Sequence, residues 1–257
     1  MAEAKDKPSQ LALLQHDVLV YRDLMLEKPG LLAPLGDLRD KDRQNLNAVV
    51  ADLYWLAIHH AMGVVQLLQQ DLRSPLVVVL RALYETVVSL RYVTSRPDPI
   101  FEALVYRAYS FLLEVKFFPD DKTLVADRHR VLAEMPQQAV QLAKERVAGT
   151  RGWSGQNMRS MAENAGFSGY ELYAWLSEEG HSRVIGQHVR LETTQQNTAH
   201  LCFGSPLEES ERENMANFAR RMLNHAFASF WRQFSGDVVN IQTTDPHKWS
   251  VEAEVAS

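Results

Sequence analysis

The sequence predicts an all-α protein built as a multi-helix bundle, and three observations support this fold class. Apolar residues recur at three- and four-residue steps along most of the 257 residues, which is the spacing of amphipathic helices. Prolines that directly follow Ser or Asp mark helix starts. No alternating pattern longer than a few residues predicts a strand. We therefore expect one helical domain over 9–235, a disordered leader at 1–8 and a loose tail at 236–257.

The helix boundaries follow from capping residues. Ser74-Pro75, Asp98-Pro99 and Ser205-Pro206 each place a capping side chain before a proline at the first helical position. The Ser168–Glu171 segment has the spacing of a capping box. The stretch 180–204 has mixed polarity, and we expect a functional loop or an irregular connection there. Helices are expected at 9–27, 40–72, 75–95, 99–118, 121–147, 155–165, 168–181 and 206–234.

Composition narrows the class of protein. Cys202 is the only cysteine, so no disulfide can form within the chain and a reducing compartment is favoured. The first ten residues are charged and lack an apolar signal core. The longest apolar run, Pro75–Leu90, is interrupted by Arg81 and Glu85, so we expect no membrane span. A net charge of −5 provides no overall attraction to nucleic acid, although it is compatible with a local basic patch. We expect a soluble cytoplasmic protein.

The segment from Ser74 to Arg96 is the most informative part of the chain. It is apolar on almost every side, which is typical of a helix in the middle of a bundle. Four-residue steps place Arg81, Glu85 and Ser89 in one polar stripe on that helix. Burying such charges is costly unless they are paired, so the stripe predicts a functional centre. The alternative is an ordinary ion pair between Arg81 and Glu85.

Two other expected helices carry polar stripes. One stripe begins at Arg107, in the helix expected at 99–118. The other consists of Tyr173, Ser177 and His181, which are spaced four residues apart in the helix expected at 168–181. If the stripes face each other, Arg81, Glu85, Ser177 and His181 form a catalytic centre, with Arg107 and Tyr173 as supporting ligand-binding residues. The alternative is that the Tyr173–His181 stripe is a solvated face. His181 follows Gly180, and a protonated imidazole is favoured at a helix C-terminus.

Several short motifs resemble a known family. They are RALYETVVSLRYV at 81–93, the Arg107–Tyr109 step, and the segment 153–182. In this order they are similar to the bacterial domain-of-unknown-function 5677 family, over about residues 45–235. The resemblance implies an all-helical bundle and carries no established activity. The matching residues are Arg81, Glu85, Trp153, Ala162, Glu163, Gly166, Tyr173, Ser177 and His181.

The first functional hypothesis is an RNA-cutting domain similar to the higher-eukaryote-and-prokaryote nucleotide-binding (HEPN) domains used in bacterial defence. Those domains use an Arg-x4–6-His pair without a metal ion, in which histidine moves protons and arginine holds the phosphate. Arg183 with His188 and Arg220 with His225 fit this spacing. Because the chain has nine histidines, such pairs also arise by chance. Only Arg183 and His188 lie next to the resembling motif, so we expect those two to bind the RNA of a defence- or stress-associated ribonuclease.

Two non-catalytic alternatives remain open. Arg81 with the hydroxyls of Tyr84, Tyr173 and Ser177 could hold a small anion in a binding module. The other alternative is a scaffold whose polar centre fixes helix register and which binds a protein partner.

No cofactor or metal is expected. Glu178-x2-His181 is the only Glu-x2-His motif, whereas a di-iron bundle needs two, and no zinc spacing occurs. The last expected helix carries an aromatic cluster that predicts either a packing face or a homodimer face. Its residues are Phe227, Phe230, Trp231 and Phe234.

Overall fold

The computed structural model confirms an all-helical bundle. It describes residues 8–27, 41–149, 151–167, 170–180, 189–193, 199–203 and 207–235. Within these ranges the elements are α1 Gln10–Glu27, α2 Lys41–Gln69, α3 Arg73–Ser95, α4 Pro99–Phe117, α5 Lys122–Glu134, α6 Gln137–Ala148, α7 Met158–Asn164, α8 Tyr170–Gly180, β1 Val189–Thr193, β2 Ala199–Phe203 and α9 Glu209–Ser235.

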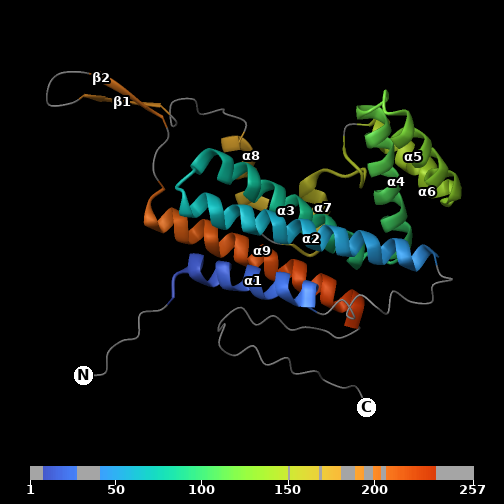
Figure 1. Ribbon diagram of the computed structural model, residues 1–257, viewed down its shortest axis with the longest axis horizontal. Helices are drawn as coiled ribbons and strands as arrows, with labels where there is room; N and C mark the ends of the chain where they lie inside the picture. Colours follow the sequence, from blue (N-terminus) through green and yellow to red (C-terminus); the bar gives the residue numbers. More distant parts are fainter. Residues whose placement is uncertain are drawn as a thin grey trace, which may run out of the picture.

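Helices α1, α2, α3 and α9 run side by side and form the main core (Figure 1). The α3 helix packs against α2 and α9, while α7 and α8 cover another of its faces. The prediction that α3 lies in the middle of the bundle is therefore confirmed for most of its surface. Val78 is an exception, because its side chain is 55% exposed. The fully covered residues of α3 include Leu76, Leu80, Leu83, Tyr84, Val87, Val88, Leu90 and Val93.

Helix α2 has the length and composition of a membrane-spanning helix. It is the one helix of the described chain that is long and apolar enough to cross a membrane. Half of its apolar window is buried inside the bundle, and the core helix of a globular protein passes the same test.

The expected caps are partly confirmed. The Asp98 side chain accepts a hydrogen bond from the Phe101 backbone N–H (3.0 Å), as expected for the start of α4. The Ser74 cap was wrong, because α3 begins at Arg73 without any side-chain cap. The preceding turn contains Asp71 in the left-handed region (φ 57°), and its carboxylate accepts from the backbone N–H of Leu207 (2.9 Å). The caps predicted at Ser168 and Ser205 lie outside the described residues.

The single helix expected at 121–147 was wrong. Pro136 lacks the N–H needed to continue a helix, so α5 ends at Glu134 and α6 begins at Gln137. Together with α4 they form a three-helix extension at one end of the bundle (Figure 1). Its two small apolar clusters are separate from the main core, and their buried members are Leu104, Val105 and Ala139 in one and Ala108, Leu132 and Ala143 in the other.

The region expected to be a loop or irregular connection contains a two-stranded antiparallel hairpin. Val189 pairs with Phe203 and Thr193 with Ala199. Each strand has five residues, which is too short for alternation to stand out in the sequence. The hairpin lies apart from the helices in Figure 1.

The aromatic cluster of α9 is a packing face within the chain. Phe227 stacks on Tyr21 of α1, with ring centroids 4.5 Å apart, and Phe230 stacks on Tyr54 of α2 at 4.3 Å. Such pairs add about 0.5–1.5 kcal/mol each beyond their burial. A homodimer through this face stays a prediction.

Candidate functional site

The structure brings α3 and α8 together at one carboxylate. Glu85 Oε1 accepts a hydrogen bond from Arg81 Nε (2.9 Å) and another from the Tyr173 hydroxyl (2.9 Å). The Arg81 guanidinium also lies over the Tyr173 ring, 5.6 Å from its centroid. Two residues one helical turn apart on α3 and one on α8 therefore form a polar centre, here named the Glu85 centre.

The Glu85 centre is less buried than expected. The side chains of Arg81 and Glu85 are 30% and 38% exposed, although most of α3 is covered. Ser89, the third member of the stripe, is buried and instead accepts a hydrogen bond from the Trp153 indole (3.4 Å). The expected buried ion pair is thus a half-exposed one, open to solvent.

Burial shifts the pKa values of the two tyrosines at this centre. Burial and then the Glu85 carboxylate raise the pKa of Tyr173. Tyr84 stacks on Tyr173 at 5.0 Å, and burial raises the pKa of Tyr84 to about 12. The Tyr84 hydroxyl has no hydrogen-bond partner among the described residues. Both phenols therefore remain protonated at neutral pH.

His60 of α2 is a titratable group whose pKa responds to Glu85, and the spacing of residues along single helices does not predict it. Burial, and then His59, lower the pKa of His60, while Glu85 acts in the opposite direction. His60 is therefore mostly neutral at pH 7. No spacing along α2 indicates this role, because Glu85 lies on a different helix.

Ser177 lies beside the centre, and the remaining predicted residues of this region lie outside the described chain. The Ser177 hydroxyl is buried next to the Tyr173 phenol, whose pKa it lowers. It does not reach hydrogen-bond geometry with any described residue. His181, Arg183 and His188 follow α8 directly in the sequence but are not among the described residues.

Arg107 was wrongly placed in this centre. It donates a hydrogen bond to Asn45 at the start of α2, and its guanidinium lies 5.3 Å from the centre of the Phe111 ring. The physical reason is that α4 packs on α2 and α6. Arg107 therefore contacts the start of α2 and not the Glu85 centre.

The other HEPN-like pair does not form a site. Arg220 Nε bonds to Asp17 of α1 (2.6 Å), whereas His225 bonds to Arg91 of α3 (2.9 Å). Positions five residues apart on a helix point about 140° away from each other. Arg220 and His225 consequently face different helices and cannot act on the same phosphate.

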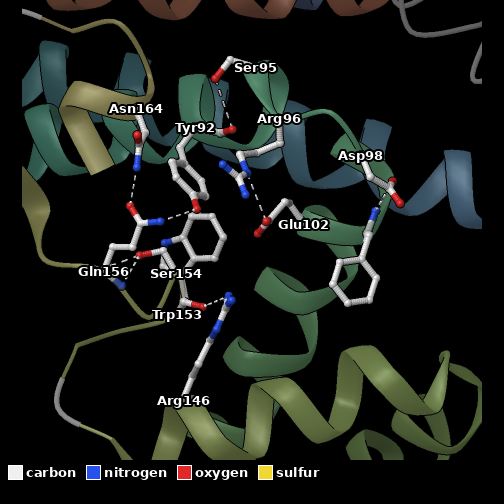
Figure 2. Close-up of polar contacts among 11 residues, drawn as sticks. Tyr92, Ser95, Arg96, Asp98, Glu102, Arg146, Trp153, Ser154, Gln156 and Asn164 are labelled. Carbon is white, nitrogen blue, oxygen red and sulfur yellow. Dashed lines mark hydrogen bonds and ion pairs between the residues drawn. The ribbon is translucent and has the colours of Figure 1, made fainter. Parts of the chain in front are cut away.

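A second polar network holds the loop between α6 and α7. Trp153 lies edge-on between Tyr92 and Tyr106, at centroid distances of 5.5 and 5.0 Å, and its carbonyl accepts from Arg146 (2.6 Å). Figure 2 shows this carbonyl pointing at the Arg146 guanidinium. The network fixes the loop against α3 and thereby sets the position of α7.

The same network continues through amide side chains. Gln156 donates to the Tyr92 hydroxyl (3.1 Å) and accepts from Asn164 of α7 (2.8 Å). Beside it, Arg96 bonds to Glu102 (3.3 Å), as Figure 2 shows. Because most of these groups are satisfied within the protein, we interpret the network as structural support and not as a reactive site.

Comparisons with known proteins identify a family for this chain but no activity. A model of a family of unknown function (DUF5677) matches residues 47–198, a range that includes both the Glu85 centre and the Trp153 loop. No curated protein matches the chain. No solved structure matches it either. Within the described ranges, no three His, Cys, Asp or Glu side chains gather as a metal site.

Proposed function

The chain belongs to the family of unknown function DUF5677, and since this membership carries no activity with it, we propose from the geometry that the Glu85 centre cleaves RNA without a metal ion. The observation that carries this proposal is the pairing of Arg81 and Tyr173 on one carboxylate oxygen of a partly exposed ion pair. We add His60, whose pKa is lowered by burial and responds to Glu85, as the proton acceptor. A cation, a positioned carboxylate and a proton acceptor are the groups that phosphodiester cleavage by a ribose hydroxyl requires.

The proposed reaction is transfer of the phosphoryl group to the neighbouring 2′-oxygen. Neutral His60 takes the proton from the 2′-hydroxyl, whose oxygen attacks phosphorus as the bond to the 5′-oxygen breaks. The imidazolium formed is stabilised by Glu85 and returns its proton to the leaving 5′-oxygen. Arg81 stabilises the charge on the phosphoryl oxygens, and Tyr173 holds Glu85 in place. The products are a 2′,3′-cyclic phosphate and a 5′-hydroxyl end.

The segment after α8 has a supporting part in this proposal. Ser177 adjoins Tyr173, and His181, Arg183 and His188 follow within a short stretch of chain. We assign Arg183 and His188 to RNA contacts, and we propose His181 as a second candidate for the proton transfers given above to His60. A HEPN-like role in bacterial defence or stress and a cytoplasmic location are proposals of the same kind.

A second candidate function is binding of a small anion without cleavage. It is favoured by the buried hydroxyls of Tyr84 and Ser177, which lie next to Tyr173 and have no hydrogen-bond partner among the described residues. Buried hydroxyls without partners are costly, and a ligand would satisfy them. Under this alternative RNA remains intact, so a cleavage assay separates the two functions.

The rate of cleavage is expected to depend on pH through His60. A base acts only when neutral, and the lowered pKa of His60 lies below its ordinary value of 6.5. The rate should therefore rise with pH below about 6.5 and be flat from about pH 7 to pH 9. Initial rates on a labelled single-stranded RNA across this range test the prediction. A rising limb centred above pH 7 would contradict the assignment of His60.

A further inference from the structure

One face of α9 carries positive charge without acidic neighbours. From Asn214 to Ser235 this helix contains no Asp or Glu. Arg221, His225 and Arg232 are separated by four and seven residues, so they lie along one stripe. The chain as a whole has a net charge of −5, which makes this stripe a local exception.

Arg91 of α3 joins the stripe. Its Nη1 donates to His225 Nδ1 (2.9 Å), so that nitrogen is an acceptor and the imidazole is neutral. Burial, Arg91 and Arg221 together lower the pKa of His225 to about 4. Burial and Arg232 lower the pKa of Arg91. Arg91 is bonded to the imidazole, Arg221 shares its stripe on α9, and Arg232 acts on Arg91. These three arginines are here named the α9 cationic patch.

No carboxylate balances this patch within the described chain. None of the ion pairs there involves Arg91, Arg221 or Arg232. The nearby acid of α7, Glu163, is paired with Arg159 (3.1 Å).

Backbone and ring contacts orient the Arg91 guanidinium. Its Nε donates to the Ala165 carbonyl (3.3 Å), and its plane lies 5.3 Å from the Phe167 ring centre. Next to it, Gly166 has φ +65°, and a Cβ there would come 3.9 Å from Nη2. The contacts to Ala165 and Phe167 hold the guanidinium in a fixed orientation. A fixed planar donor of this kind is suited to phosphate oxygens.

The patch is connected to the Glu85 centre by a row of rings. Tyr173 stacks on Tyr84 at 5.0 Å, Tyr84 meets Phe167 edge-on at 5.7 Å, and Phe167 contacts the His225 ring at 4.8 Å. Arg81 and Arg91 are ten positions apart on α3, which corresponds to about 15 Å along the helix axis. A few nucleotides of single-stranded RNA span that distance.

We propose that Arg91, Arg221 and Arg232 bind the phosphodiester backbone of the single-stranded RNA whose cleavage is assigned to the Glu85 centre. This inference rests on the proposed function for the identity of its ligand. Contacts of this type position the strand and carry no sequence information. They also make affinity depend steeply on salt, because each neutralised phosphate releases a counterion.

The test uses exposed positions that form no ion pair in the described chain. Binding of a fluorescein-labelled single-stranded RNA to the full chain is followed by anisotropy over a salt series. For the Arg221→Gln, Arg232→Gln double variant, we expect the slope of log affinity against log salt to fall by about 1.4. The same relation gives about 25-fold weaker binding at 0.1 M salt. The control is a chain with both Arg130→Gln and Arg151→Gln, at exposed positions of α5 and of the loop before α7, which removes two positive charges elsewhere.

Affinity within twofold of wild type in the double variant, with an unchanged salt slope, would overturn the proposal. Binding of inorganic phosphate is measured in a second experiment. If free phosphate binds as tightly as the RNA does, phosphate and not RNA is the ligand of the patch. Cleavage by wild type and Arg81→Ala is followed in parallel. If the double variant binds RNA more weakly than wild type but neither wild type nor Arg81→Ala cleaves RNA, the proposed reaction is wrong and the patch assignment stands. If the double variant binds RNA as tightly as wild type, and cleavage is lost only in Arg81→Ala, the patch assignment is wrong and the proposed reaction stands.

Discussion

Replacing Arg81 with alanine is expected to lower the rate of RNA cleavage by at least about 100-fold, which is the typical effect of losing one charge-stabilising donor. Stability should fall by less than about 1 kcal/mol, because the Arg81–Glu85 pair is 30% and 38% exposed and such pairs contribute little. A large loss of rate with a small loss of stability separates a reactive group from a structural one. Single-turnover cleavage and thermal unfolding of the same preparation measure both.

Arg159→Ala is the matched control for this prediction. Arg159 forms an ion pair of the same i,i+4 type with Glu163, on the exposed surface of α7. Its removal should leave the cleavage rate within about twofold of wild type and cost a similar small amount of stability. Equal loss of rate in both variants would mean that Arg81 has no special part in the reaction.

Replacing Arg220 with alanine is expected to produce the largest loss of stability of any variant considered, about 3–5 kcal/mol. Its guanidinium and the Asp17 carboxylate are only 12% and 8% exposed and lie 2.6 Å apart. Removing the arginine leaves a buried carboxylate without its partner between α1 and α9. Urea unfolding, read as the change in midpoint at constant slope, measures the cost.

The control for Arg220 is Arg22→Ala, since Arg22 pairs with Asp23 at the surface of the same helix as Asp17. That variant should lose less than about 1 kcal/mol. Replacing both partners, as Asp17→Leu with Arg220→Met, should recover much of the stability because no unpaired charge remains. An Arg220→Ala variant as stable as Arg22→Ala would show that the buried pair is not what joins α1 to α9.

Spacing along single helices predicted much of the fold and part of the centre. The apolar character of α3 predicted its central position in the bundle. Four-residue steps selected Arg81, Glu85 and Tyr173, which the structure brings together. Such steps fix which residues share a face of one helix. They contain no information about which helix that face meets, so the Arg107 stripe was assigned to the wrong neighbour.

Other features depended on contacts between distant segments. His60 and Glu85 lie on different helices, as do His225 and Arg91, and no local spacing relates them. Pro136 is a readable signal in the sequence, since a proline ends the helix before it, although the apolar pattern continues on both sides of it.

The measurement that tests the central claim most directly is an RNA cleavage assay in EDTA with analysis of the ends. Purified wild type and His60→Gln are incubated with a single-stranded RNA labelled at its 5′ end. The proposed mechanism predicts wild-type fragments that end in a 2′,3′-cyclic phosphate, and a rate at least about 100-fold lower for His60→Gln. Intact RNA with wild type, or equal cleavage by both proteins, would contradict the assignment of a ribonuclease to the Glu85 centre.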